Sequence, residues 1–526
     1  MKNQGLSGEA KDTVWDLLVI GGGATGLGVA VQAALEGRCV ALVEARDFAA
    51  GTSSRSTKLL HGGVRYLAQG RLRLVREALH ERATVLGLAP HLAQPLAFVV
   101  PGRGWLSWAW TGLGLKAYQW LSGRMSLGPT TALSKQALLR CLPGLPRMVA
   151  GAVAGMRYWD GQFEDARLAL ALAKTAREAG ASVHNHMRVT ALAPSVQGWQ
   201  VTLFNERDGQ TSTLQARCVV NATGVWVDAL RQMVLQPWAG QEPVKAQVKP
   251  SQGVHLVVAR ESLPIQEAVL IPRTADGRVL FAVPWLGATV IGTTDTPRSD
   301  APLEPLPLQE ELDFLFRETR QALGVDLTRA DVRSVWVGLR PLVKSTHSAQ
   351  GGATSQMSRE HLIRREAPGL FTVTGGKWTT YRSMATQVMQ AVVAQDDLPP
   401  VAQGPGKTAE HRLVGAPDVA QAVHAISEAP GLHLWGSEAA LVQALPGAER
   451  DLGMGLTEAM VRFAARSEWA LTVEDMLARR WRALFLDARQ AARMAPAVAA
   501  LLQEETGLDP QLDAFLALCQ RYTLAD

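Results

Sequence analysis

Three short apolar runs in this chain each lead into a cluster of small residues. The runs begin at Trp15, Val219 and Leu370, and the residues that follow them are rich in glycine, alanine and threonine. A short apolar run bounded by glycine is typical of a strand that is buried on both faces of a parallel sheet. Because parallel strands end at the same edge of a sheet, we expect these three ends to converge on one ligand.

The first run leads into a glycine-rich turn and then into a helical pattern. Gly21 allows a tight turn, Gly23 lets the backbone approach a pyrophosphate, and Gly26 lets the helix pack closely on the strand. The helix N-terminus offers its N–H groups to the anion. A second strand, residues 39–43, ends in Glu44, where a carboxylate accepts hydrogen bonds from an adenosine ribose. A glycine turn without any ligand is the structural alternative.

This glycine pattern alone does not distinguish NAD from FAD. FAD is long enough to need further glycine-rich contacts, and the strand ends at residues 222–224 and 375–377 provide them. The polar segment 51–66 combines hydroxyl groups, glycines, a histidine and two arginines, and we interpret it as a binding loop. We therefore expect FAD as the cofactor.

The remaining pattern predicts a second sheet and a helical end. Hairpin-like β patterns between residues 250 and 295 indicate a separate sheet that roofs the flavin, and an apolar stripe predicts a helix within residues 70–90. After a proline- and glycine-rich linker the chain becomes rich in alanine and leucine. A capping box begins there at Thr472, and Pro496 suits the first turn of a helix.

These elements predict an α/β protein with a glutathione-reductase-like, Rossmann-type FAD-binding fold, a β-rich substrate or cap domain and a helical C-terminal domain. The first two domains are expected to be interleaved over residues 1–398. The predicted FAD-binding parts are residues 12–70, 165–240 and 340–395, and the predicted cap parts are residues 71–164 and 241–339. The linker covers residues 399–410, and the helical domain covers residues 411–526.

The composition fits a globular protein and excludes some classes of function. The chain has 526 residues, of which 47% are apolar and 19% charged, so it is not disordered as a whole and can form two or three domains. A net charge of +5 is small for this length, and the sequence contains no zinc-finger or RNA-recognition spacing. We therefore expect no nucleic-acid partner.

The positions of cysteine and histidine indicate neither disulfides nor a metal. The four cysteines lie far apart, which favours a reducing cytoplasm. Residues 180–189 read as a strand on which His184 and His186 would share one face, but no third ligand is evident, so no metal site is expected. The polar first eight residues are unlike a signal peptide, and no apolar run reaches the roughly 18 residues of a membrane span. A soluble or peripheral protein is expected.

Residues 104–121 contain four tryptophans and are flanked by Arg103 and Arg124. Tryptophan with basic flanks suits a helix that lies in a membrane interface. An aromatic helix packed on the core of the protein itself is the alternative, because tryptophan rings bury large areas in either setting. The sequence leaves both interpretations open.

Several sequence blocks resemble the FAD-dependent, aerobic and respiratory-type glycerol-3-phosphate dehydrogenase family. The most specific are Thr-Ser-Ser-Arg-Ser-Thr-Lys-Leu-Leu-His-Gly-Gly-Val-Arg-Tyr-Leu at residues 52–67 and Gly-Gly-Lys-Trp-Thr-Thr-Tyr-Arg at residues 375–382. The resemblance extends over nearly the whole chain, including residues 461–499 of the helical end. It implies oxidation of sn-glycerol 3-phosphate to dihydroxyacetone phosphate, with hydride passing to flavin N5 and electrons to membrane quinone.

The resemblance also implies a location and a set of cofactor residues. The protein is expected to be cytoplasmic and peripherally associated with the inner face of the cell membrane; its oligomeric state, including a homodimer, is left open. The residues expected at the cofactor are Gly21, Gly23, Gly26, Glu44, Thr52, Ser53, Ser56, Lys58, Leu59, His61, Val189, Ala222, Thr223, Gly224, Gly376, Lys377, Trp378 and Thr379.

The substrate residues follow from the chemistry of a phosphorylated alcohol. Arginine grips a phosphate through two parallel hydrogen bonds, which suits Arg65 and Arg340, although either arginine could instead pair with a structural carboxylate. The resemblance places Arg340 and Lys377 beside substrate and flavin, where positive charge favours an alkoxide. Tyr66 and Thr294 complete the expected substrate contacts.

Oxidation of an alcohol also needs a base. His61 and His255 are the candidates, and the sequence does not choose between them or exclude a structural role for either. An FAD-dependent amine oxidase of the glycine or sarcosine oxidase type is an alternative enzyme, although it has less use for two phosphate-binding arginines. A flavin-binding module without catalysis is the alternative outside enzymes.

Overall fold

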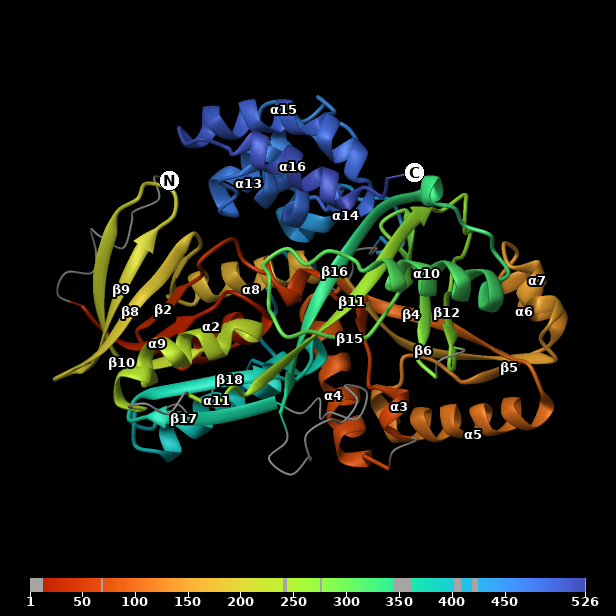
Figure 1. Ribbon diagram of the computed structural model, residues 1–526, viewed down its shortest axis with the longest axis horizontal. Helices are drawn as coiled ribbons and strands as arrows, with labels where there is room; N and C mark the ends of the chain where they lie inside the picture. Colours follow the sequence, from red (N-terminus) through yellow and green to blue (C-terminus); the bar gives the residue numbers. More distant parts are fainter. Residues whose placement is uncertain are drawn as a thin grey trace.

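The computed structural model shows two β-sheets side by side, with a group of C-terminal helices above them (Figure 1). The α/β, Rossmann-type fold with a second, β-rich region is thereby confirmed. The structure describes residues 13–67, 70–239, 244–274, 277–344, 361–401, 408–418 and 424–525.

The first sheet is mainly parallel. Its strand order is β17 (His361–Ala367), β18 (Leu370–Gly375), β10 (Thr211–Asn221), β1 (Val14–Ile20), β2 (Val40–Val43) and β7 (Ser182–His184), and the antiparallel strands β9 (Gly198–Asn205) and β8 (Met187–Ser195) extend it from β10. Leu17 and Val19 of β1 pack with helices α2 (Ala24–Leu35), α8 (Asp165–Glu178) and α11 (Tyr381–Ala394). Leu18 and Ile20 pack with β8, β9 and α9 (Val227–Ala239). Burial on both faces explains the almost continuous apolar run.

The ends of the three apolar runs lie at one edge of this sheet. β18, β10 and β1 are parallel neighbours, with Ile20 opposite Asn221 and Asn221 opposite Thr372. The predicted convergence of the three glycine-rich ends is therefore confirmed.

The second sheet is mostly antiparallel and confirms the expected β-rich region. Its order is β15 (Thr296–Pro297), β11 (Val248–Ala259), β14 (Ala288–Gly292), β13 (Leu280–Trp285), β12 (Ala268–Ile271), β4 (Ala93–Gly102), β6 (Ala154–Phe163) and β3 (Leu59–Leu60); β16 (Val332–Val343) also pairs with β11, and β5 (Thr131–Leu133) with β6. The short strand β3 belongs to this sheet although it lies within the range predicted for the FAD-binding part. Residues 51–66 therefore lead from one sheet to the other.

Helices pack on both faces of the second sheet. The helix predicted within residues 70–90 is confirmed as α4 (Leu72–Leu88). The others in this region are α3 (Val64–Leu67), α5 (Trp105–Ser122), α6 (Lys135–Cys141), α7 (Pro146–Ala150) and α10 (Gln309–Glu318). Figure 1 shows α5 along the lower edge of the molecule.

The C-terminal region is helical, as predicted. It contains α12 (Ala439–Gln443), α13 (Glu458–Ser467), α14 (Ala483–Leu486), α15 (Ala488–Thr506) and α16 (Leu512–Tyr522). The capping box is present, since the Asp475 N–H donates to Thr472 Oγ1 at 3.1 Å. Pro496 is not in a first turn but inside α15, which begins eight residues earlier with Asp487 as its cap. Burial of one side of α15 in the core supports the helix at the residue where proline removes a donor.

Candidate functional site

A cavity of about 620 Å³ opens where β1, β10 and β18 end. It runs from Glu44 past the glycine turn to Gly376 and Lys377. Twelve of the residues expected at the cofactor line it: Gly21, Gly23, Glu44, Thr52, Ser53, Val189, Ala222, Thr223, Gly224, Gly376, Lys377 and Trp378. Gly26, Ser56, Lys58, Leu59, His61 and Thr379 are not among its lining residues.

The glycine turn has the geometry that a dinucleotide pyrophosphate needs. Gly21 has a φ of +114°, and a Cβ at this position would lie 2.6 Å from the Ala222 carbonyl oxygen. A Cβ at Gly26 would overlap the Gly21 carbonyl oxygen, so only glycine lets α2 pack on the turn. The N-cap of α2 is Gly23, which has no side chain, and the Ala24 N–H donates to Ser53 Oγ at 3.0 Å. Gly23, Ala24 and Thr25 line the cavity, so the positive end of the helix faces it.

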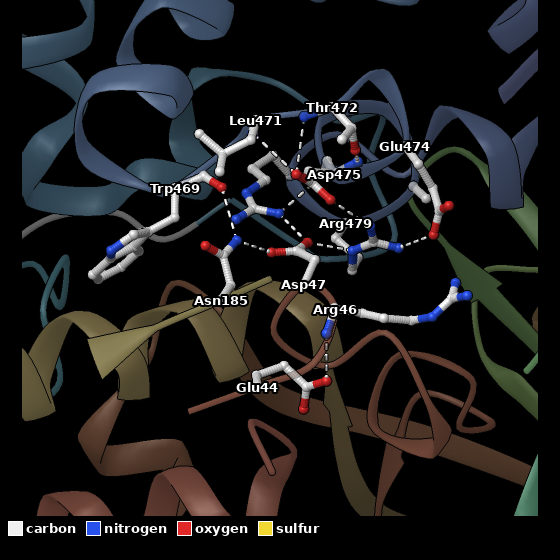
Figure 2. Close-up of polar contacts among 12 residues, drawn as sticks. Glu44, Arg46, Asp47, Asn185, Trp469, Leu471, Thr472, Glu474, Asp475 and Arg479 are labelled. Atoms are coloured by element: carbon white, nitrogen blue, oxygen red, sulfur yellow. Dashed lines mark hydrogen bonds and ion pairs between the residues drawn. The ribbon is translucent and has the colours of Figure 1, made fainter. Parts of the chain in front are cut away.

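Glu44 lies at the end of β2, where the dinucleotide-binding pattern predicts an acidic residue. Its Oε2 accepts the Gly22 N–H at 2.7 Å and its Oε1 accepts the Arg46 N–H at 2.9 Å. Burial raises the pKa of the Glu44 carboxyl, while these two hydrogen bonds act in the opposite direction. The carboxylate is thereby oriented at the end of the cavity where an adenosine ribose is expected (Figure 2).

The opposite end of the cavity brings Lys377 close to Tyr66. The Lys377 Nζ lies 4.0 Å from the centre of the Tyr66 ring, a cation–π contact that restricts the position of the ammonium group. A Cβ at Gly63 would lie 2.5 Å from the Tyr66 ring, so this glycine makes room for the pair. The His61 carbonyl oxygen accepts Thr379 Oγ1 at 3.4 Å, which places the turn at His61 beside the same segment.

Arg340 is held in one position in the second sheet. Its Nη2 donates to Thr293 Oγ1 and to the Thr294 carbonyl oxygen, each at 3.1 Å, and its Nη1 lies 3.4 Å from Asp295. The guanidinium crosses Gly253, where any Cβ would overlap it. The next residue on β16, Pro341, lines the cavity, so the backbone of Arg340 lies beside it, while the guanidinium is held over β11.

His255 lies two residues after Gly253 on β11. Its Nε2 is 3.0 Å from Thr57 Oγ1, and its ring stacks on Trp336 with a centre-to-centre distance of 4.0 Å. Burial holds the pKa of His255 well below its usual value, and the positive charges of Arg340 and Lys58 lower it further. The imidazole is therefore neutral in the ordinary pH range.

The side chains of two residues expected at the cofactor, Lys58 and Ser56, have structural partners instead. The buried Lys58 Nζ donates to Asp165 at 2.7 Å and to the Ser54 carbonyl oxygen at 2.8 Å, so its ammonium is not directed at a cofactor. Burial and the nearby Arg482 lower the pKa of Lys58 to about 7. Ser56 Oγ also donates to Asp165, at 2.7 Å. Buried polar groups must find partners within the protein, and here residues distant in sequence supply them.

The expected substrate contact through the Thr294 hydroxyl is likewise corrected. Thr294 Oγ1 donates to Glu311 at 2.8 Å and accepts the Val254 N–H at 2.9 Å, so this fully buried hydroxyl ties β11 to α10. Only the carbonyl oxygen of Thr294 contacts the site, through Arg340. The side chain of Arg65 lies outside the described residues.

His184 and His186 do not share a strand face. β7 ends at His184, and His186 has a φ of +54°, which breaks the predicted strand. His184 Nε2 lies 2.7 Å from Ser182 Oγ, and His186 Nε2 lies 3.0 Å from Asp475. Among the residues that the structure describes, no group of three His, Cys, Asp or Glu side chains is placed to hold a metal.

Sequence reasoning did not assign roles to Thr57 and Asp295. Both lie inside segments that the sequence analysis singled out, the polar segment 51–66 and the β patterns between residues 250 and 295. Nothing in their spacing relates Thr57 to His255 or Asp295 to Arg340, because these contacts form only when distant strands pair.

Comparisons with known proteins agree with this geometry. A family model described as FAD dependent oxidoreductase matches residues 16–382, and one described as the C-terminal domain of alpha-glycerophosphate oxidase matches residues 407–512. Mitochondrial glycerol-3-phosphate dehydrogenase of Homo sapiens is 37% identical over 94% of this chain and 71% of its own length.

Solved structures extend the comparison to the fold. The glycerol-3-phosphate dehydrogenase from Bacillus halodurans complexed with FAD has a TM-score of 0.75 and 28% identity, and the match covers 98% of this chain and 97% of that one. Glycine oxidase from Geobacillus kaustophilus, at 21% identity and a TM-score of 0.52 over 76% of this chain and 98% of its own, shares the fold. The protein described here therefore uses FAD as its cofactor and belongs to the family of FAD-dependent glycerol-3-phosphate dehydrogenases.

Proposed function

We propose that this protein oxidises sn-glycerol 3-phosphate to dihydroxyacetone phosphate and passes the electrons to a membrane quinone. The observation that carries the proposal is the presence of two restrained cations, the Lys377 ammonium, which lines the cavity, and the Arg340 guanidinium, one residue before the lining residue Pro341. A small phosphate monoester carries about two negative charges at neutral pH and suits two cations. Relatives named glycerol-3-phosphate dehydrogenase support the same substrate.

Binding and proton removal fall to the protein, whereas bound FAD supplies the hydride acceptor at its N5. Arg340 presents a planar fork whose position is already set by Thr293 and Thr294, so little flexibility is lost when it binds an anion. The charges of Arg340 and Lys377 also favour an alkoxide over an alcohol, which lowers the energy needed to remove the hydroxyl proton.

His255 is our first candidate for the group that accepts this proton. Burial keeps its imidazole neutral, the form that can take a proton, and the same lowering of the pKa makes His255 a weaker base than an exposed histidine. Thr57 and Trp336 hold its ring in place from two sides. His61, in the turn beside Lys377 and Tyr66, is the second candidate.

Anaerobic titration of the FAD-loaded protein tests the proposed substrate. We expect sn-glycerol 3-phosphate to bleach the flavin absorbance as it donates its hydride, and sarcosine and glycine to leave the spectrum unchanged. Glycerol, which lacks the phosphate, serves as the matched control and is expected to bleach the flavin poorly. Bleaching by sarcosine alone would establish the amine oxidase alternative. If none of these compounds bleached the flavin, the result would support the alternative of a flavin-binding module without catalysis.

The exposed face of α5 supports the proposed membrane acceptor. Trp105, Leu106, Trp110, Leu113 and Trp120 have between 62% and 81% of their surface exposed. Exposed apolar patches of this kind mark membrane or protein interaction sites. The opposite face of the helix packs on the protein: Leu115 and Tyr118 are buried, and Trp108 Nε1 donates to the Gly155 carbonyl oxygen at 3.0 Å. Packing on the core thus describes one face of α5, and the membrane interpretation is our proposal for the exposed face.

Positive charge accompanies the apolar face of α5. Arg103, Lys116 and Arg124 are exposed along or beside the helix, where they suit anionic lipid headgroups. Within the part of the chain that the structure describes, no helix is both long and apolar enough to cross a membrane. We propose that α5 attaches the protein peripherally to the cytoplasmic face of the membrane, where quinone is available.

Removing two exposed apolar side chains should weaken membrane binding. We expect Trp110→Ser combined with Leu113→Ser to reduce flotation with anionic liposomes at least tenfold, since each side chain contributes about 1.5–3 kcal/mol when buried. Turnover with a soluble dye acceptor should not change. The matched control is Val196→Ser combined with Leu441→Ser, two exposed apolar residues elsewhere. Equal flotation of the α5 variant and the unmodified protein would contradict this attachment.

A further inference from the structure

The C-terminal helical domain forms part of the wall of the cofactor cavity. Five of its residues line the cavity together with Glu44 and the β8 start: Thr472, Glu474, Asp475, Arg479 and Gln511. Glu44, where the adenosine ribose is expected, lies at one end of the cavity and Lys377 at the other, with the glycine turn for the pyrophosphate between them. Because the five C-terminal residues lie beside Glu44, they are at the adenosine end. Four of them, Thr472, Glu474, Asp475 and Arg479, are labelled in Figure 2, where they lie on the opposite side of Asp47 from Glu44 and Arg46.

A buried ionic cluster holds the domain in this place. Asp47, three residues after Glu44, accepts hydrogen bonds from both Arg479 and Arg480, and all three side chains are buried. Asn185 Nδ2 donates to Asp47 and to the Trp469 carbonyl oxygen, each at 3.0 Å. The segment that carries the ribose-binding acid is therefore bonded directly to the C-terminal domain.

A second contact of this interface lies at the cavity itself. His186 Nε2 lies 3.0 Å from Asp475, and both residues line the cavity. Burial opposes ionisation of Asp475, but His186 and Arg479 hold the pKa of this carboxyl well below its usual range. The carboxylate also accepts the N–H groups of Leu471 and Thr472 at 2.9 Å, which orders the loop that faces the cofactor.

Two further contacts tie the rim of the cavity to the same domain. Arg207, in the turn between β9 and β10, donates to the Asp509 carbonyl oxygen. Glu304, which lines the cavity from the loop before α10, accepts a hydrogen bond from Tyr522 at 3.1 Å, and its carbonyl oxygen accepts Arg521. Residues of the C-terminal region thus also hold Arg207 and Glu304, two further lining residues of the cavity.

Two of the lining residues have groups suited to a nucleobase. Glu474 is partly exposed, and its Oε1 accepts Arg479 Nη1 at 2.7 Å, which orients the carboxylate. Gln511 is exposed and is held at a φ of +58°, with its N–H donating to Asp509 at 2.9 Å. Adenine presents an amino donor beside a ring-nitrogen acceptor, and glutamine amides and carboxylates are the side chains that pair with such groups.

We propose that Glu474 and Gln511 bind the adenosine half of FAD, and that FAD binding and docking of the C-terminal domain stabilise each other. Any ligand that contacts only the docked form favours that form by mass action, and the coupling acts equally in both directions. The inference depends on the FAD site and is independent of the alcohol that is oxidised.

The first test compares FAD affinity in the full-length apoprotein. We expect Glu474→Ala to weaken FAD about tenfold, the loss expected for a hydrogen bond to a charged group, and to weaken ADP by the same factor in competition. Arg479 keeps Asp47 and Asp475 as partners in this variant, so the domain should stay folded. Glu504→Ala, in the same domain but outside the cavity, is the matched control. Unchanged FAD and ADP affinities for Glu474→Ala would overturn the proposal.

The second test uses the unmodified chain and needs no variant to fold. Hydrogen–deuterium exchange is measured on the apoprotein, with FAD and with ADP. We expect both ligands to slow exchange in residues 469–480 and 508–515 as well as in the glycine turn, because both contain the adenosine half. Slower exchange confined to residues before 400 would show that the C-terminal domain takes no part in cofactor binding.

Discussion

We expect Arg340→Ala to lower kcat/KM for sn-glycerol 3-phosphate by a factor on the order of 10³, while FAD stays bound. A hydrogen bond between the guanidinium and a substrate phosphate or alkoxide is worth about 1.5–3 kcal/mol, and the substitution also removes the positive charge that favours the alkoxide. Arg340 itself does not line the cofactor cavity, so its loss should not release FAD. Steady-state turnover with a dye acceptor and the flavin content of the purified variant measure the two effects separately.

Two companion variants identify the source of this loss. Arg340→Lys keeps the charge but not the planar fork, and we expect it to recover only part of the lost kcat/KM. Arg333→Ala removes a partly exposed arginine from the same strand, whose nearest carboxylate is Glu261 at 3.7 Å, and it should leave turnover unchanged. A turnover for Arg340→Ala within a factor of about three of the unmodified enzyme would place Arg340 outside the site.

The second large effect is expected on stability. Asp47→Ala leaves Arg479 and Arg480 buried without their shared carboxylate, and removal of one partner from a buried ion pair costs about 3–5 kcal/mol. We expect the free energy of unfolding, measured by urea titration of the FAD-loaded protein, to fall by this amount. The two arginines lie more than 400 residues away in the sequence, so the loss reflects the docking of the C-terminal domain.

A surface carboxylate provides the control for Asp47. Asp326 pairs with Arg147 at 3.2 Å, and both side chains are largely exposed. Exposed ion pairs contribute little, so Asp326→Ala should change the free energy of unfolding by no more than about 0.5 kcal/mol. If the two variants unfold at the same urea concentration, the buried cluster does not stabilise the docked domain.

Much of the cofactor site could be predicted because its signals are local. Gly21 and Gly26 are required by backbone geometry within a few residues of each other, and β1 is apolar throughout because both faces of a central parallel strand are buried. Glu44 follows its strand directly. The position of each of these residues can be predicted from its neighbours in the chain, and each lies where the pattern predicts.

The sequence could not distinguish the roles of residues that have the same chemical type. Lys58 and Lys377 both lie in specific motifs and were both expected at the cofactor, yet Asp165 engages Lys58 in the core and only Lys377 reaches the cavity. Thr294 was expected at the substrate, but its hydroxyl is used by Glu311. The motif identifies the residue type, whereas the partner that packs beside it decides the role.

The sequence by itself determined the Rossmann-type fold, the glycine turn, the acidic residue Glu44 at the end of β2 and the helical character of the C-terminal end, because hydrophobic period and glycine geometry act over a few residues. Only the tertiary structure decided that Arg340 crosses Gly253, that one face of α5 is exposed, and that the C-terminal domain borders the adenosine end of the cavity. These features depend on contacts between segments as far apart as Asp47 and Arg479, and the partners in such contacts are set by how sheets and helices pack.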